Sequence, residues 1–186
     1  DYTWPVIVIS MVIVISFRIT DLIIKKTRPV IYNELLNLLF IIYILCLFQV
    51  VTIQDVSFGG ANLIPFKEIF RYDIGSYLFY KNILGNVLLF LPFGLMACYI
   101  LKIKRVSTMI ILSLISSFSI EITQLYIGRV FDVDDVILNV LGSVIGFYLF
   151  KLLEKIFNLL HNKIAKEWVI NILMFIFIII VVRLLV

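Results

Sequence analysis

Several stretches of about 20 residues contain almost nothing but apolar side chains, and they constrain this chain more than any other feature. A helix needs about 20 such residues to cross the hydrocarbon core of a bilayer. Over the 186 residues, 63% are apolar and 15% are charged, whereas a soluble domain is about 45–50% apolar and about 25% charged. The chain has too little polar surface to cover itself in water, so we expect an integral membrane protein.

The apolar runs predict an all-α fold, a polytopic transmembrane bundle of about six spans. The first run contains Arg18 and Asp21 near its end, which we interpret as an interfacial end whose side chains reach toward the polar layer. A signal peptide is not expected, because basic residues follow this run and do not precede it. The predicted spans are residues 4–24, 32–51, 82–101, 106–127, 134–153 and 167–186.

The basic residues are divided unequally between the two ends of these spans. Eleven Lys and Arg residues lie at three connections that share one side, 18–28, 102–105 and 151–166, and five lie elsewhere. Because cytoplasmic loops accumulate Lys and Arg, these three connections are expected in the cytoplasm. The 52–81 loop and the 128–133 turn are then expected to face outward.

Polar residues recur at helical spacing on two consecutive spans. Each stripe repeats every three or four residues, so it occupies one face of its helix. A six-residue turn joins the two spans, which predicts antiparallel neighbours whose stripes face each other or a shared cavity. The stripes are Ser113, Ser117, Glu121 and Gln124 on one span and Asp135, Asn139, Gly142 and Gly146 on the next.

Several of these groups have a structural explanation beside a functional one. Asp132 would also cap the following span, with Asp135 near its third position, and the helix dipole favours both; this structural explanation applies equally to Asp134. Ser113 is able to bond its own helix backbone. Gly142 and Gly146 form a GxxxG pattern, which allows close helix contact.

Glu121 is harder to explain by structure alone. It lies six residues before Ile127, or about 9 Å from the expected end of the span by helical rise. A charge at the bilayer centre costs about 2.5–3.5 kcal/mol on insertion scales. Glu121 is therefore expected to be protonated or paired, with Arg129 as the nearest cation in sequence. It belongs either to a functional site or to a structural pair with Arg129.

Two further features lie between residues 60 and 95. Pro65 suits the first position of a short helix, and Phe66 and Phe70 then fall on one face. This predicts a short amphipathic outer-leaflet helix near 65–71. On the span at 82–101, Asn82, Asn86 and Phe93 form a third stripe, and Pro92 is expected to kink the helix and free a carbonyl.

Four short blocks together resemble the VanZ-like family of bacterial membrane proteins. The blocks are Asn62–Phe66, Gly85–Asn86 through Leu91–Gly94, Glu121 with Gln124, and Arg129 through Asp135 to Asn139 and Gly142. The resemblance implies a multi-pass helical protein of the bacterial cell membrane. The family takes its name from a protein that confers resistance to teicoplanin, a glycopeptide bearing an acyl chain.

The resemblance also implies an organisation and a set of site residues. We expect one membrane domain over 1–186, with a VanZ-like core at 60–150 and flanking spans in 1–59 and 151–186. Glu121 and Asp135 are the candidate catalytic residues if the protein is an enzyme. The candidate ligand-binding residues are Asn62, Pro65, Phe66, Asn86, Pro92, Phe93, Gln124, Arg129, Asp132 and Asn139.

The favoured function is the binding or handling of a lipid-linked or acylated cell-envelope molecule at the outer leaflet, contributing to resistance against teicoplanin-type glycopeptides. Arg129 would hold an anionic head group, while Asn86, Gln124 and Asn139 would bond polar substituents. The expected partners are membrane lipids and a lipid-linked envelope precursor or an acylated glycopeptide. Nucleic acid is not expected.

Three other functions stay open from the sequence. In an intramembrane enzyme, Glu121 and Asp135 would act as a general acid/base pair. No cofactor and no metal site are expected, although a cation held by Asp132, Asp134, Asp135 and Glu121 would be Mg²⁺ or Ca²⁺. A small transporter would use Glu121 as a proton relay, but no inverted repeat is evident. The last alternative is a scaffold in an envelope complex.

Overall fold

The computed structural model describes residues 3–25, 31–52 and 60–159, together with residues 172, 175, 176 and 179. The described residues are nearly all helical, which confirms the predicted all-α class. The chain forms two compact units: residues up to Gln49 belong to one of them, and Val50–Leu159 form the other. That residues 1–186 form one membrane domain stays a prediction.

The first unit contains α1 (Thr3–Lys25) and most of α2, which begins at Ile31 and runs to Thr52. Arg18 on α1 donates from two guanidinium nitrogens to the two carboxylate oxygens of Glu34 on α2, both over 2.7 Å. It also pairs with Asp21 at 3.0 Å. The charged residues that interrupt the first predicted span therefore join the two helices of a hairpin.

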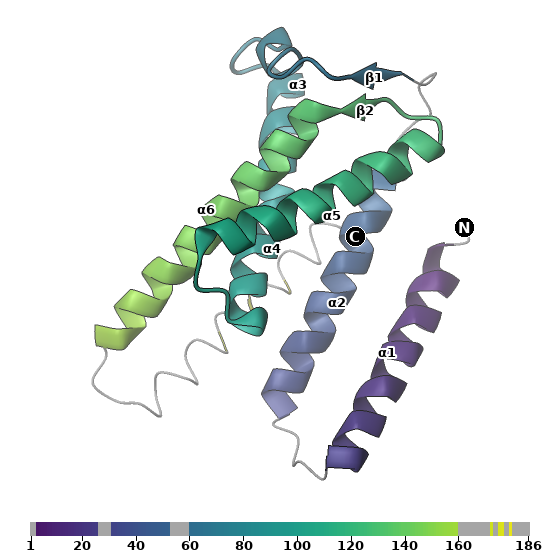
Figure 1. The fold of residues 1–186 in the computed structure, drawn as a ribbon, viewed down its shortest axis with the longest axis vertical. Helices are drawn as coiled ribbons and strands as arrows, with labels where there is room; N and C mark the ends of the chain where they lie inside the picture. Colours follow the sequence, from purple (N-terminus) through teal and green to yellow (C-terminus); the bar gives the residue numbers. More distant parts are fainter. Residues whose placement is uncertain are drawn as a thin grey trace. The chain divides into compact units, whose positions relative to one another are not determined.

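The second unit is built on three long helices (Figure 1). The first of them starts with α3 (Tyr77–Phe79), continues through a π-helical turn (Tyr80–Leu84) and becomes α4 (Gly85–Leu101). It is followed by α5 (Val106–Tyr126) and α6 (Val133–Leu159). The helix α6 packs along α4 and against α5, so it holds the unit together.

Within the described residues, three helices are long and apolar enough to cross a membrane: Tyr77–Leu101, Val106–Tyr126 and Val133–Ile156. They correspond to the spans predicted at 82–101, 106–127 and 134–153. The first two predicted spans form α1 and α2, and the span predicted at 167–186 lies almost wholly outside the described residues. The protein is thus a helical membrane protein, while the count of six spans is not confirmed.

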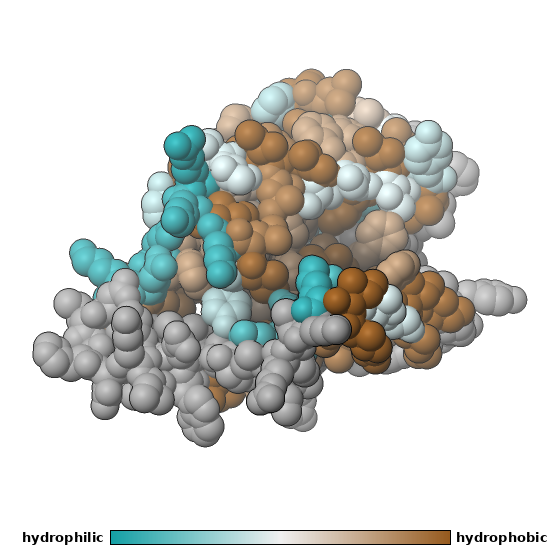
Figure 2. Space-filling view, turned by 60° about the horizontal axis from the view of Figure 1, so that its bottom comes forward, coloured by the Kyte–Doolittle hydropathy of each residue, from teal (hydrophilic) through white to brown (hydrophobic). Residues whose placement is uncertain are grey.

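The outward faces of α5 and α6 are apolar. On the face shown in Figure 2 much of the surface is hydrophobic, and the hydrophilic residues gather in separate clusters. Water would not cover so much exposed apolar surface favourably, whereas lipid does. The exposed stripes consist of Ile111, Ile115, Phe118, Ile122 and Leu125 on α5 and of Leu141, Ile145, Tyr148 and Leu152 on α6.

Glycines form the seam between α4 and α6. A Cβ atom at Gly142 would overlap the Val87 carbonyl, and one at Gly146 would overlap the Leu91 carbonyl. On the opposite helix, a Cβ at Gly94 would overlap the carbonyl of Ser143. The GxxxG pattern thus brings two backbones into contact, as predicted, and its partner is α4.

Residues 60–72, which we call the strap, differ from the predicted helix at 65–71. The chain forms a turn at 64–68 and then a single 3₁₀ turn, Ile69–Arg71. Phe66 has a φ of 68°, in the left-handed region that an α-helix excludes. At its start the strap contributes β1 (Ala61–Asn62), which pairs in parallel with β2 (Phe131–Asp132) just before α6 (Figure 1).

Candidate functional site

Asp132 joins the strap to the start of α6. Its Oδ1 atom accepts the backbone N–H of Asp134 over 2.9 Å, which is the bond of a helix N-cap. The same oxygen accepts the side-chain amide of Asn62 over 2.9 Å. The predicted capping role of Asp132 is therefore confirmed, and Asn62 is fixed by the same carboxylate.

Asp134 holds the turn of the strap. This residue is 1% exposed, and its carboxylate accepts three backbone N–H groups, those of Phe66, Glu68 and Ile69. In a helix at 65–71, these N–H groups would lie in the first turn, where they have no carbonyl partner within the helix, or would donate to a carbonyl one turn earlier. A carboxylate from a residue far along the chain thus organises the strap, which explains why the predicted helix does not form.

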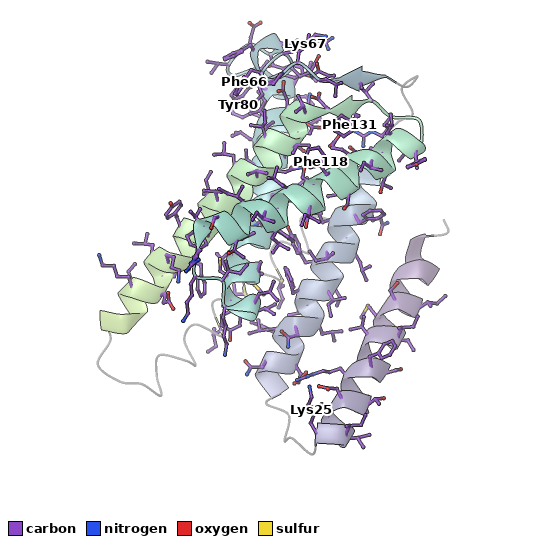
Figure 3. All side chains as sticks on the ribbon, viewed as in Figure 1. Lys25, Phe66, Lys67, Tyr80, Phe118 and Phe131 are labelled. Carbon is purple, nitrogen blue, oxygen red and sulfur yellow. The ribbon has the colours of Figure 1, made fainter. Side chains whose placement is uncertain are left out.

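Glu121 is 1% exposed and supports the strand β2. Its Oε2 atom accepts the backbone N–H of Asp132 over 2.9 Å. Phe118, three residues before Glu121, and Phe131, next to Asp132, stack their rings with centroids 6.2 Å apart (Figure 3). The turn after α5 therefore folds back onto α5, and the Glu121 carboxylate has a peptide group as a partner.

The polar stripe of α6 divides between two neighbouring helices. The Asn86 amide on α4 donates to Asp135 Oδ1 over 2.5 Å. One turn further along, the Asn139 amide donates to the Ser117 hydroxyl on α5 over 2.9 Å. The two stripes on α5 and α6 do face each other, as predicted, but the first turn of α6 directs Asp135 toward α4.

A cavity of about 190 Å³ opens where the strap meets the ends of the three helices. It is smaller than the roughly 300–1,000 Å³ of a site for a drug-sized ligand, so it suits a head group or one sugar unit. Most of its lining residues are polar. They are Glu68, Ile69, Tyr72, Lys81, Asn82, Ile83, Gly85, Asn86, Leu89, Gln124, Arg129, Asp132, Asp134, Asp135 and Leu138.

Five of the candidate residues from the sequence line this cavity: Asn86, Gln124, Arg129, Asp132 and Asp135. The other candidates lie around it without lining it. Glu121 and Asn139 are buried in the contacts between helices, Pro92 and Phe93 are buried on α4, and Asn62 with Pro65 and Phe66 belongs to the strap. The cavity is thus lined by Asp135 and not by Glu121.

The carboxylates do not assemble into a metal site in the described part of the chain. No group of three or more His, Cys, Asp or Glu side chains there is arranged to hold an ion. Asp134 directs both oxygens at backbone N–H groups of the strap. Asp132 lies outside the spanning helices, and its burial raises the pKa of its carboxyl, an effect partly offset by the hydrogen bonds from Asp134 and Asn62.

A family model described as VanZ/LLP1 matches residues 35–158, more than half of the chain. The chain belongs to the VanZ/LLP1 family. The match contains the core predicted at 60–150 and every residue that lines the cavity. No curated protein and no solved structure matches the chain.

Four polar residues of this VanZ/LLP1 protein line the cavity without having been candidates: Glu68, Tyr72, Lys81 and Asn82. Asn82 lies four residues before Asn86, so the stripe of that span gave a signal for it. Lys81 had no such signal, because a lysine next to the expected end of a span is ordinary. Glu68 and Tyr72 reach the cavity only through the turn of the strap.

Proposed function

We propose that this protein binds the polar head group of a lipid-linked or acylated cell-envelope molecule at the outer leaflet of the bacterial cell membrane. The observation that carries the proposal is a polar cavity at the ends of three membrane-spanning helices, of a size for a head group. Arg129 and Lys81 supply positive charge, and Asn86 and Gln124 supply amides.

The apolar surface beside the cavity supports a ligand that stays in the membrane. The strap and the residues after it expose large apolar side chains next to the lining residues Glu68, Tyr72 and Lys81. Phe70 is 82% exposed, Ile74 is 89% exposed, and Leu63, Ile64, Phe66, Tyr77 and Leu78 are also exposed. Such side chains are stable in the interfacial layer of a bilayer. An acyl chain lying there would place its head group at the cavity.

We also propose the finer topology predicted from the sequence, with six spans in all and the strap at the outer face. In Figure 3, Phe66, Lys67 and Tyr80 lie at the end of the second unit that carries the strap. The excess of basic residues at the other loops assigns this end to the outside. We therefore place the strap in the outer leaflet, as a turn rather than as the amphipathic helix predicted at 65–71.

Impermeant thiol labelling of intact cells tests this orientation. Cysteines introduced by Ile74→Cys and Lys104→Cys lie at exposed positions at opposite ends of the unit, and the native Cys46 and Cys98 are buried. Labelling is expected at position 74 and not at position 104. The reverse result would invert the topology and remove the outer-leaflet site.

Lipid analysis of the purified full chain tests the binding itself. Wild-type protein is expected to retain a specific lipid, measured by mass spectrometry after extensive detergent washing. Asp135→Asn is expected to lose it, because the cavity loses a carboxylate while the side chain keeps its size. The matched control is Asp73→Asn, since Asp73 is exposed and does not line the cavity. Equal retention by both variants would contradict the proposal.

Resistance in a susceptible Gram-positive host tests the biological role. Expression of the protein is expected to raise the inhibitory concentration of acylated glycopeptides such as teicoplanin, with little effect on matched compounds without the chain. Asp135→Asn is expected to abolish the difference. Equal protection against both compounds would exclude recognition of the acyl chain.

A further inference from the structure

Two neighbouring residues of the cavity lining, Lys81 and Asn82, use none of their polar side-chain atoms within the described part of the chain. Neither side chain makes a hydrogen bond or an ion pair with another described residue. An ammonium group and a carboxamide together offer several N–H donors. The cavity therefore carries unused hydrogen-bond donors next to each other.

The carboxylates of the lining are already engaged. Asp134 accepts three backbone N–H groups, Asp132 accepts two donors, and Asp135 accepts the amide of Asn86. Glu68 is paired with Arg71 at 3.0 Å. A ligand that enters thus meets the free donors of Lys81 and Asn82 in a cavity whose lining also contains several carboxylates and the guanidinium of Arg129.

The backbone at this point is itself unusual. Lys81 and Asn82 lie in the π-helical turn Tyr80–Leu84, between the short α3 and the long α4. Such turns are rare and occur frequently at functional sites. Here the turn lies at the end of the membrane-spanning helix Tyr77–Leu101. The donors are thus presented near the depth at which lipid head groups lie.

The charged residues of the cavity lining limit which other groups a ligand with one anionic group is able to carry. One phosphate matches the ammonium of Lys81 and the amide of Asn82. A second anion would be repelled, because the lining contains four acidic residues, Asp132 and Asp135 among them, against the two basic residues Lys81 and Arg129. Hydroxyl groups suit those carboxylates, because a hydroxyl donates a hydrogen bond to an oxygen that still has lone pairs. The volume of about 190 Å³ leaves room for a small polyol or one sugar unit.

We propose that the cavity binds a phosphodiester lipid whose head group carries hydroxyls, with the phosphate at Lys81 and Asn82 and the hydroxyls toward Asp135 and Asn86. This inference rests on the proposed function and names the class of its ligand. The acyl chains lie outside the cavity against the exposed residues Tyr77, Leu78 and Tyr80.

The test measures binding to the purified full chain by native mass spectrometry and by thermal shift. The probes are phosphatidylglycerol, phosphatidylcholine and diacylglycerol with the same acyl chains, together with free glycerol 3-phosphate. Phosphatidylglycerol is expected to bind about tenfold more tightly than diacylglycerol, since a hydrogen bond to a charged group contributes that much or more. Phosphatidylcholine, which has no hydroxyl on its head group, is expected to bind more weakly than phosphatidylglycerol.

The variants assign the effect to the two donors. Lys81→Gln and Asn82→Leu are expected to remove most of the preference for phosphatidylglycerol over diacylglycerol. Lys67→Gln is the matched control, because Lys67 is exposed and does not line the cavity. The proposal would be overturned if the Lys81→Gln variant elutes as a folded protein and still prefers phosphatidylglycerol over diacylglycerol as strongly as the wild type does.

The remaining results separate the two proposals. Equal binding of all three lipids would overturn the phosphodiester site and leave the lipid-binding function standing. Absence of binding in every arm would overturn both. Glycerol 3-phosphate binding as tightly as phosphatidylglycerol would show a site for a free phosphate ester and overturn the assignment to a lipid.

Discussion

The backbone N–H of Asp132 donates a hydrogen bond to Oε2 of Glu121 over 2.9 Å. Glu121 is only 1% exposed. The most deeply buried carboxylate of the polar stripes therefore supports the residue that caps α6 and holds Asn62. Glu121 acts on the cavity through the position of Asp132, which itself lines it.

Comparison of Glu121→Gln with Glu121→Ala separates this positioning role from a need for charge. Glutamine keeps an oxygen acceptor at the same reach, so we expect it to retain stability within about 1 kcal/mol and to retain lipid binding. Alanine leaves a buried N–H without an acceptor and is expected to cost about 1–3 kcal/mol. Thermal unfolding in detergent measures both. An equal loss of stability in Glu121→Gln and Glu121→Ala would mean that the carboxylate itself is required.

Removal of the Asp134 carboxylate is expected to release the strap. In Asp134→Ala three backbone N–H groups lose their acceptor, and local opening at 66–69 becomes easier. Lys67 is an exposed site in this turn, so limited trypsin digestion should cleave after Lys67 at least several-fold faster than in the wild type. Asp73→Ala is the control and should be cleaved at the wild-type rate. An unchanged cleavage rate in Asp134→Ala would show that other contacts hold the strap.

The seam between α4 and α6 is expected to be intolerant of a single methyl group. Gly142→Ala places a Cβ atom on the Val87 carbonyl, and neither backbone is able to move without separating the helices. We expect a loss of about 1–3 kcal/mol, typical of overpacking. Gly60→Ala is the matched control, because nothing lies within 4 Å of the added atom. Equal melting temperatures for the two variants would contradict the close packing.

Stability should depend on pH through Asp132. Burial raises the pKa of its carboxyl above the ordinary value of 3.8, so the folded state binds a proton more tightly than the unfolded state. Stability from this group is therefore highest in acid and falls as pH rises from about the ordinary value through the raised one. Asp132→Asn keeps the Oδ1 acceptor and removes the titration. The difference in melting temperature between wild type and Asp132→Asn should change across this pH range, and parallel curves would exclude the effect.

The regular parts of the fold follow from spacing alone. The helices α5 and α6, their mutual packing and the cap at Asp132 are what the polar stripes and the position of Asp132 before an apolar run predict. Periodicity does not say which neighbour a stripe residue contacts. Asn139 contacts α5, whereas Asp135 and the glycines of the same stripe contact α4.

The strap shows why some lining residues of the cavity were not predicted from the sequence. Local pattern favoured a helix at 65–71, since Pro65, Phe66 and Phe70 have the right spacing. The observed turn depends on Asp134, which is 68 residues after Phe66 in the chain. A long-range contact of this kind leaves no mark on the strap's own sequence. Glu68 and Tyr72 line the cavity as a result of it.

Asp134 recognises the strap by its peptide groups and not by its side chains. Ile64, Phe66 and Lys67 are exposed, and exchanging their side chains for those of other residues that keep the backbone N–H would leave the three donors to the carboxylate in place. The anchoring of this segment and the chemical character of its outer surface are thus separate properties. The same scaffold is suited to present different side chains to different lipid environments, as an antibody framework presents different loops.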